Sequence, residues 1–518
     1  MIIINNINLS LDTDFSDLKN IIENKIGFKA ESVRLYRKSV DARRKNDVHF
    51  CCSVLVETKN EQAVLKKNKN AQVFVKKEYV WQRCENNLQN PPLVVGFGPC
   101  GMFCALTLAR AGLNPVVIER GADVDTRIKD IEHFLNSGEL NENSNVQFGE
   151  GGAGTFSDGK LNTGIKDIRS RTVLEEFVRF GADEKILIDA KPHIGTDILV
   201  DIVKNIRKEI ISLGGKVLFN TKLEKINIAE GKVKSVVASG EEILCDRLIL
   251  ATGHSARDVF SLLKEQNIAL QQKPFSVGVR IEHRQEDINK ALYGEFYNHP
   301  SLSAADYKLV THLENGRGVY TFCMCPGGEV INSTSEKNTV TVNGMSYSRR
   351  DGDNANSALL VGVEPSDFPT DDVLAGCEFQ RKIEQKSYEV LKGSVPITTV
   401  GQFVFGKEFK LGKVKPTVKP KYDFAQFSEI FPEFVTESLK EGIKIFDNKI
   451  KGFADESAVL TAPETRSSSP VRILRDEDYQ SVSLKGFYPA GEGAGYAGGI
   501  MSAAVDGMRV AEQVIKSL

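Results

Sequence analysis

One ten-residue stretch, Leu93 to Met102, constrains the fold more than any other part of the chain. It reads Leu-Val-Val-Gly-Phe-Gly-Pro-Cys-Gly-Met, in which three apolar residues precede a Gly-x-Gly-x-x-Gly turn, and a run of small and apolar residues follows. This order predicts a strand, a tight turn and a helix. Gly96 would allow the turn, Gly98 would let the backbone approach a pyrophosphate, and Gly101 would let the helix pack on the strand. The helix N-terminus would then offer free N–H groups to the phosphates.

Composition excludes several classes of protein. The 518 residues include 67 Lys and Arg against 69 Asp and Glu, so the overall charge favours neither a nucleic-acid-binding protein nor a strongly acidic one, although a local basic patch remains open. The nine cysteines do not repeat as a disulfide framework would, nor do they pair with histidines as zinc ligands do. The first residues lack a basic signal-peptide region, and no apolar run approaches the ~18 residues of a membrane span. We therefore expect a cytoplasmic protein with reduced thiols, no membrane association and no metal.

Residues 1–88 are predicted to form a separate domain. Strand and helix patterns alternate there in the order β-α-β-β-α-β, which suggests a ferredoxin-like α+β fold. Its two middle strands are joined through the basic segment Arg37 to Lys45. Such a segment is typical of a solvated hairpin tip, but it is also compatible with a docking surface for RNA or for a protein partner. The residues 89–92 mark the end of this domain.

Two further segments support a nucleotide site. The second apolar strand ends in Glu119-Arg120, where a carboxylate that binds ribose is expected, and Arg120 would face the adenosine edge or solvent. The glycine-rich stretch Gly149 to Leu161 suggests backbone close to a ligand, and we interpret it as a second segment in contact with the cofactor, through Gly154 and Thr155.

Later motifs reveal a family resemblance. A β-meander that begins near Leu223 leads to a return strand ending in Ala251-Thr252-Gly253, and the segment Gly486 to Ile500 is again rich in glycine. Together with the first glycine turn, these segments resemble the flavoproteins of the glutathione-reductase type and their last FAD-binding segment. In that class an aspartate usually contacts the ribityl chain; this sequence departs from the pattern, because Glu492 stands in that place.

The resemblance narrows to a bacterial group of uncharacterised FAD-dependent dehydrogenases, or NAD(P)/FAD-dependent oxidoreductases, with an N-terminal ferredoxin-like domain. It is carried by Phe148 to Leu161, Lys191 to Asp197, Lys273 to His283, Phe322 to Gly328 and Ala462 to Arg472, and it covers essentially the whole chain. The resemblance implies FAD binding and no settled reaction.

The expected architecture is therefore α/β. It comprises the ferredoxin-like domain, a Rossmann-like FAD-binding domain formed by 89–273 and 466–518, and an inserted α+β substrate domain at 274–465. That insertion shows no second strand–Gly-x-Gly-x-x-Gly–helix unit, so NAD(P)H, if it serves as a transient donor, would bind without that fingerprint.

Combined, motifs and resemblance predict a set of residues in contact with the cofactor. These are Gly96, Gly98, Pro99, Cys100, Gly101, Glu119, Arg120, Gly154, Thr155, Leu223, Thr252, Gly253, Gly491, Glu492, Gly498, Gly499 and Ile500.

No catalytic residue is assigned; the candidates are Arg466 and Cys325. Arg466 could hold an anionic substrate or the reduced flavin, or simply bond loop carbonyls. Cys323 and Cys325 would share one face of an extended strand, which would allow a thiol relay to the flavin through Cys325. His254 follows the return strand and is either a flavin contact or a loop histidine.

The predicted function is transfer of a hydride or electron pair between FAD and a small-molecule substrate. The alternatives are a flavoprotein of RNA modification, in which the N-terminal domain recruits RNA or a protein, and a flavin-bound sensor without turnover.

Overall fold

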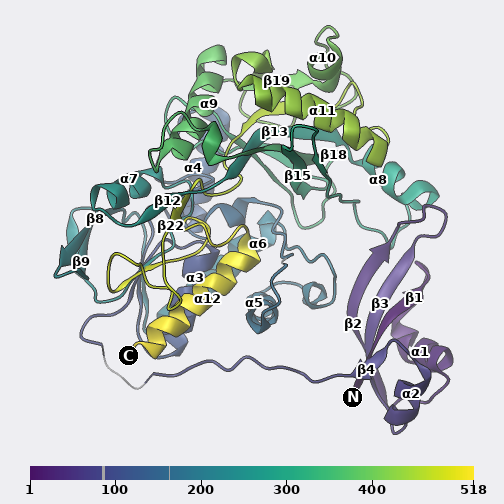
Figure 1. The fold of residues 1–518 in the computed structure, drawn as a ribbon. Helices are drawn as coiled ribbons and strands as arrows, with labels where there is room; N and C mark the ends of the chain where they lie inside the picture. Colours follow the sequence, from purple (N-terminus) through teal and green to yellow (C-terminus); the bar gives the residue numbers. More distant parts are fainter. Residues whose placement is uncertain (85–87, 163) are drawn as a thin grey trace.

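The computed structural model describes residues 1–84, 88–162 and 164–518. It contains three sheet-based parts, which Figure 1 shows as the N-terminal sheet at one side, a parallel sheet at the centre and a large mixed sheet above it. Residues 85–87 of the predicted domain 1–88 lie outside the described residues.

The central part is built on a five-stranded parallel sheet. Its strands, in spatial order, are β23 (Phe487–Pro489), β11 (Leu248–Leu250), β5 (Leu93–Val95), β6 (Val116–Ile118) and β7 (Lys216–Leu218). Strands from distant parts of the sequence are therefore hydrogen-bonded neighbours. The sheet begins in the chain with β5, the strand before the first glycine turn, and the C-terminal strand β23 completes it.

Alternation along these short strands directs side chains to two cores. Val94 and Ile249 pack in one core with helices α3, α5, α6 and α12, whereas Leu93, Val95 and Leu250 pack in the other with α7 and the antiparallel meander β8–β10. The helices are α3 (Pro99–Arg110), α5 (Ile168–Arg179), α6 (Thr196–Ser212), α7 (Arg257–Glu265) and α12 (Ile500–Lys516). The meander strands are β8 (Leu223–Ala229), β9 (Lys232–Ala238) and β10 (Glu241–Leu244).

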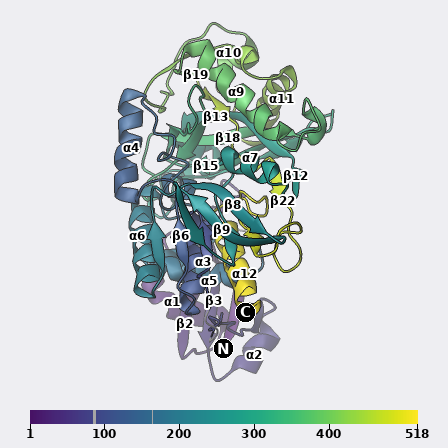
Figure 2. The same ribbon diagram turned by 90° about the vertical axis from the view of Figure 1, so that its left-hand side faces the viewer.

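The segment between β11 and β23 contributes a seven-stranded mixed sheet. Its order is β14 (Val310–His312), β15 (Gly318–Cys325), β18 (Asn354–Val363), β13 (Phe275–Arg284), β21 (Val459–Glu464), β19 (Val395–Thr399) and β20 (Tyr422–Phe424). Helices α9 (Ala375–Leu391), α10 (Val400–Phe405) and α11 (Glu433–Lys449) cover its outer face, and its inner face looks toward the parallel sheet (Figures 1 and 2). This places the insertion as a cap over the nucleotide fold.

Six further elements complete these two parts of the molecule. They are α4 (Val124–Ser137), β12 (Leu270–Gln272), α8 (Gln285–Tyr293), β16 (Glu329–Asn332), β17 (Val342–Met345) and β22 (Val471–Ile473). The pairs β12–β22 and β16–β17 are separate two-stranded sheets.

The N-terminal part is a four-stranded antiparallel sheet with two helices. Its strands pair in the order β2 (Ser32–Asp41), β3 (His49–Glu57), β1 (Ile2–Leu9) and β4 (Ala71–Val73), with helices α1 (Leu18–Ile26) and α2 (Glu61–Lys67). The chain order of these elements is the predicted β-α-β-β-α-β.

This sheet contacts the rest of the molecule at two places. At one end, the turns after β1 and β2 lie against the insertion: His299 Nε2 lies 3.2 Å from Asp12 Oδ1, and a Cβ on Gly294 would be 3.0 Å from the Cβ of Lys45. Along its edge, Lys38 N–H donates to the Ile188 carbonyl. The extended residues 74–84 then lead away to α3 and α12 (Figure 1).

Among the described residues, no helix combines the length and apolar character that crossing a bilayer requires.

Candidate functional site

A cavity of about 490 Å³ lies where the carboxyl ends of the parallel strands face the large sheet. Of the predicted cofactor-contacting residues, all line it except Gly101, Thr155 and Gly491. In an open parallel sheet, ligands bind at this edge, where the strand order reverses. The cavity therefore joins segments that are up to four hundred residues apart in the sequence.

The three motif glycines have different surroundings. Gly96 has φ +100°, and a Cβ there would lie 2.4 Å from the Ala251 carbonyl oxygen, so the turn requires glycine. A Cβ on Gly101 would lie 1.9 Å from the Gly96 carbonyl oxygen, so this glycine lets the helix pack on the turn behind the cavity. At Gly98 a Cβ would touch only Gly152 Cα at 3.7 Å. The protein itself thus leaves room at Gly98, on the side that faces the cavity.

Two helix N-termini also face the cavity. Helix α3 begins at Pro99 after the N-cap Gly98, and α12 begins at Ile500 after the N-cap Gly499. Neither N-terminus has a side-chain capping hydrogen bond, so first-turn N–H groups can donate to a ligand. One cavity flanked by two such positive helix ends suits an elongated anionic cofactor.

Glu119 lines the cavity while its carboxylate organises the turns around it. Its Oε2 accepts from Phe97 N–H at 2.8 Å, and its Oε1 accepts from the N–H groups of Gly121 and Gly149, each at 3.0 Å. Arg120 bonds to Asp258 and lies over the Phe148 ring, with its guanidinium carbon 4.4 Å from the ring centroid. Glu119 therefore ties both glycine-rich segments together.

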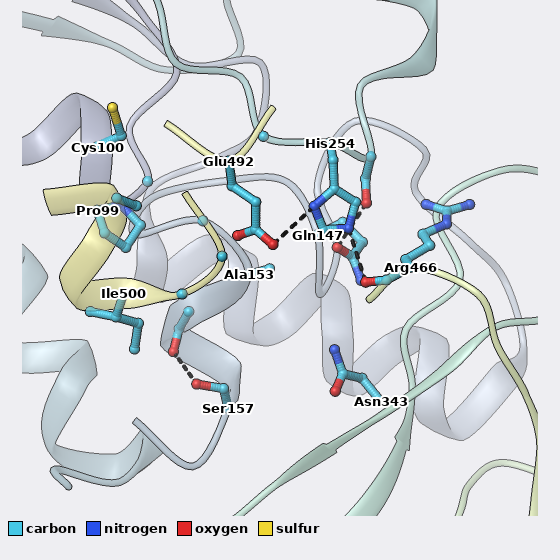
Figure 3. A pocket seen from close by; sticks show the side chains of 18 of the residues that line it. Pro99, Cys100, Gln147, Ala153, Ser157, His254, Asn343, Arg466, Glu492 and Ile500 are labelled. Atoms are coloured by element: carbon cyan, nitrogen blue, oxygen red, sulfur yellow. Dashed lines mark hydrogen bonds and ion pairs between the residues drawn. The ribbon is translucent and has the colours of Figure 1, made fainter. Parts of the chain in front are cut away.

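His254 and Glu492 meet inside the cavity. His254 Nδ1 lies 3.3 Å from Glu492 Oε1, while its Nε2 lies 3.0 Å from the Arg466 carbonyl oxygen (Figure 3). A ring that donates from Nε2 to this carbonyl leaves Nδ1 to exchange a proton with the carboxylate. Glu492, which replaces the usual aspartate, therefore has His254 as its partner in this chain.

The Arg466 guanidinium bonds to other side chains of the protein and is not free to bind a substrate. It is buried, donates to Glu384 Oε2 at 2.9 Å and also bonds to Ser335 Oγ. Arg257 bonds to the same carboxylate at 2.7 and 2.8 Å. Burial would raise the pKa of Glu384, but the two arginines outweigh it and hold that pKa far below its usual value. Arg466 thus offers the cavity its main-chain carbonyl.

The expectation that Cys323 and Cys325 share one face needs correction. The register between β15 and β18 shifts between Phe322 and Cys325, and Cys323 has φ +45°. This bulge breaks the alternation of an extended strand, so Cys323 lines the cavity whereas Cys325 is fully buried outside it. Burial raises the pKa of the Cys325 thiol to about 12, and its Sγ donates to the Cys323 carbonyl at 3.2 Å. Cys325 is therefore a protonated structural thiol.

Comparison with known proteins agrees with this arrangement. Residues 91–283 match the family "Pyridine nucleotide-disulphide oxidoreductase", residues 274–467 match "FAD-dependent protein, C-terminal domain-like", and residues 1–57 match a domain of unknown function. A protein of Clostridium beijerinckii, described as "Uncharacterized protein", is 48% identical over 523 residues, which cover 99% of this chain and 98% of the relative. The chain belongs to the FAD-dependent protein family with a pyridine nucleotide-disulphide oxidoreductase domain.

Solved structures are more distant from this FAD-dependent protein. A glycerol-3-phosphate dehydrogenase from Bacillus halodurans complexed with FAD has 12% identity and a TM-score of 0.36, with 84% of this chain and 65% of that chain covered. L-proline dehydrogenase from P. horikoshii has 12% identity and a TM-score of 0.35, with coverages of 83% and 95%.

The far end of the cavity was not predicted from the sequence. The insertion contributes Tyr307, Lys308, Thr321, Phe322, Asn343 and Glu464 there, and the 153–161 loop contributes Ser157, Asp158 and Lys160. Ser157, Asp158, Lys160, Phe322 and Glu464 lay within motifs quoted from the sequence, but none of them was predicted to line this end of the cavity. Tyr307, Lys308, Thr321 and Asn343 lay outside those motifs, and no local pattern of the sequence places them at the cavity.

Among the described residues, no group of three or more His, Cys, Asp or Glu side chains is arranged to hold a metal ion.

Proposed function

We propose that this protein is an FAD-dependent oxidoreductase that transfers a hydride or an electron pair between flavin and an organic substrate held under the inserted cap. The observation that carries the proposal is the single cavity flanked by the uncapped N-termini of α3 and α12. The bound flavin would supply the site of hydride exchange.

The chain's residues then have separable tasks. The α3 N-terminus and the open face of Gly98 would bind the pyrophosphate, and Glu119 would reach the adjacent ribose. The α12 N-terminus would stabilise negative charge at the flavin ring end through its N–H groups and dipole. The large sheet would cover this end, and His254, beside Glu492, can hold or release a proton at Nδ1.

The test begins with the purified full-length chain. We expect bound FAD, seen in the absorbance spectrum and released on denaturation. Anaerobic addition of NADH, NADPH or single members of a metabolite panel should bleach the flavin with at least one of them. A protein that binds no FAD, or whose flavin no donor in the panel reduces, contradicts the oxidoreductase proposal; a flavin that binds but never turns over would instead indicate a sensor.

A further inference from the structure

The cap end of the cavity carries an excess of positive charge. Each carboxylate that the insertion or the 153–161 loop brings there has its own cation: Asp158 bonds to Arg350, Asp306 to Lys191 at 2.7 Å, and Glu464 to Arg280. Lys160 and Lys308 also line this end, and neither has a carboxylate within 4 Å among the described residues. Although burial opposes them, Lys191 and Lys160 keep the pKa of Asp306 below its usual value. Positive potential therefore dominates this region.

Lys160 is held firmly on both sides. Its backbone pairs with His193; beside it, Leu161 N–H donates to the Pro192 carbonyl at 2.9 Å, and Ile194 N–H donates to the Gly159 carbonyl at 3.1 Å. Gly159 has φ +66°, and a Cβ there would lie 2.9 Å from Gly195 N. The loop that carries Lys160 is therefore fixed in place against the 192–195 segment.

The side chain of Lys160 crosses from this loop to the cap. Its Nζ donates to the Met324 carbonyl in the β15 bulge. That bulge is itself fixed, because the buried Arg280 donates from Nη1 to the Cys323 carbonyl at 2.9 Å and from Nη2 to Asn343 Oδ1 at 2.6 Å. An ammonium group has three donors, so Lys160 keeps donors for a ligand after bonding to Met324.

Apolar groups line the same cavity as Lys160. Phe322, next to Cys323, leaves 37% of its surface exposed and lines the cavity. Ile500 lines the cavity from the opposite domain. Lys160 bonds to the carbonyl of Met324, two residues after Phe322. A cavity that has both an exposed aromatic ring and an ammonium group without a carboxylate suits an organic body with an anionic group rather than an inorganic ion.

We propose that the cap end of this cavity binds an organic carboxylate, that Lys160 bonds to its carboxylate group, and that Phe322 contacts its apolar body. This inference rests on the proposed function, since it names the substrate class of the same site. Lys308, which is exposed at this end, contributes to attraction and not to direct bonding.

The test compares charged and neutral ligands of the same shape on the FAD-loaded protein. Benzoate and benzamide, and hexanoate and hexanamide, are titrated while the flavin absorbance spectrum is recorded, and binding is also measured by calorimetry. We expect each carboxylate to bind more tightly than its amide. Lys160→Gln should weaken carboxylate binding about tenfold or more, as loss of a charged hydrogen bond does, and leave amide binding and FAD affinity unchanged. Lys308→Gln should have a smaller effect, and the exposed Lys129→Gln, on α4, should have none.

Two results would overturn the inference. One is equal binding of carboxylate and amide by the wild-type protein; the other is a Lys160→Gln variant that retains its preference for carboxylates or loses FAD by the same factor. Because calorimetry needs no flavin signal, failure to bind FAD, which sinks the proposed function, is distinguishable from failure to prefer carboxylates.

Discussion

At the scale of single residues, we expect Gly98 to be needed for cofactor binding and Gly101 to be needed for folding. Gly98 has an ordinary φ of −79° and only one neighbour within 4 Å of a Cβ, at 3.7 Å. Gly98→Ala should therefore fold like the wild type, but it should place a methyl group where the pyrophosphate of the proposed FAD would approach, and weaken FAD binding about tenfold or more. Gly101→Ala would place its Cβ 1.9 Å from the Gly96 carbonyl, so it should lower the unfolding temperature even without FAD.

Thermal unfolding of the apoprotein and FAD titration together check this pair. The two variants serve as controls for each other. An unstable Gly98→Ala apoprotein, or a Gly101→Ala protein as stable as the wild type, would contradict these assignments.

The roles of Gly98 and Gly101 could be predicted from the sequence because they depend only on the geometry of neighbouring residues in the chain. The spacing of the motif brings Gly101 over Gly96 within one turn of helix, so no distant residue is needed. Lys160, in contrast, could be placed only once the Met324 carbonyl was known to lie opposite it.

A buried carboxyl group, Glu282 on β13, makes stability depend on pH. Burial raises its pKa from 4.5 to about 7, opposed by hydrogen bonds from Thr417 and Asn354. The folded protein therefore retains a proton that the unfolded chain releases, so this stabilisation is complete below pH 4.5 and is lost as pH rises through about 7. Between pH 5 and 8 the free energy of unfolding should fall by up to about 3 kcal/mol more in the wild type than in Glu282→Gln. Urea unfolding across this range checks the prediction, and parallel curves for the two proteins would refute it.

At the scale of elements, the edge of the N-terminal sheet supports the segment that fixes Lys160. In β2, Lys38 N–H donates to the Ile188 carbonyl at 2.9 Å, and its carbonyl accepts from Ala190 N–H at 2.8 Å. Lys38→Pro removes that donor and should release residues 188–194, whereas Lys38→Ala keeps the backbone bonds. We expect faster amide hydrogen exchange at Ala190 and Ile194 in the proline variant only. If exchange becomes equally faster in both variants, the segment is instead held by the side chain of Lys38, which lies near Asp189.

Secondary structure could be predicted where the local sequence pattern was clear. The prediction failed where contacts with distant residues interrupt a regular element. The small and apolar residues after the first glycine turn predicted a helix, and α3 spans Pro99–Arg110. The strand around Cys323 was predicted, but its bulge was not, because Arg280 in another strand holds the Cys323 carbonyl. Likewise, the unit from β5 through α3 to β6 follows from local strand–turn signals, whereas the strand order of the large sheet depends on pairings across almost two hundred residues.

At the scale of the whole molecule, one carboxylate joins the cap to the nucleotide fold. Glu384 on α9 is fully buried and bonds to Arg257 at the start of α7 and to Arg466. Glu384→Gln would leave two buried guanidinium groups without a full counter-charge, and loss of one partner from a buried ion pair costs about 3–5 kcal/mol. Because the carbonyl of Arg466 accepts from His254, the variant should also bind FAD less tightly.

The same helix offers the control that distinguishes this network from a general loss of charge. Glu378 is half-exposed and pairs with Arg381, and an exposed pair contributes at most about 1 kcal/mol. In urea unfolding, Glu384→Gln should therefore lose at least about three times as much stability as Glu378→Gln. The wild type should have a higher free energy of unfolding than Glu384→Gln at neutral pH. This difference should disappear only in strong acid, since the arginines keep Glu384 ionised. Equal losses in the two variants would mean that the cap is held to the nucleotide fold by its apolar contacts, with Glu384 contributing little.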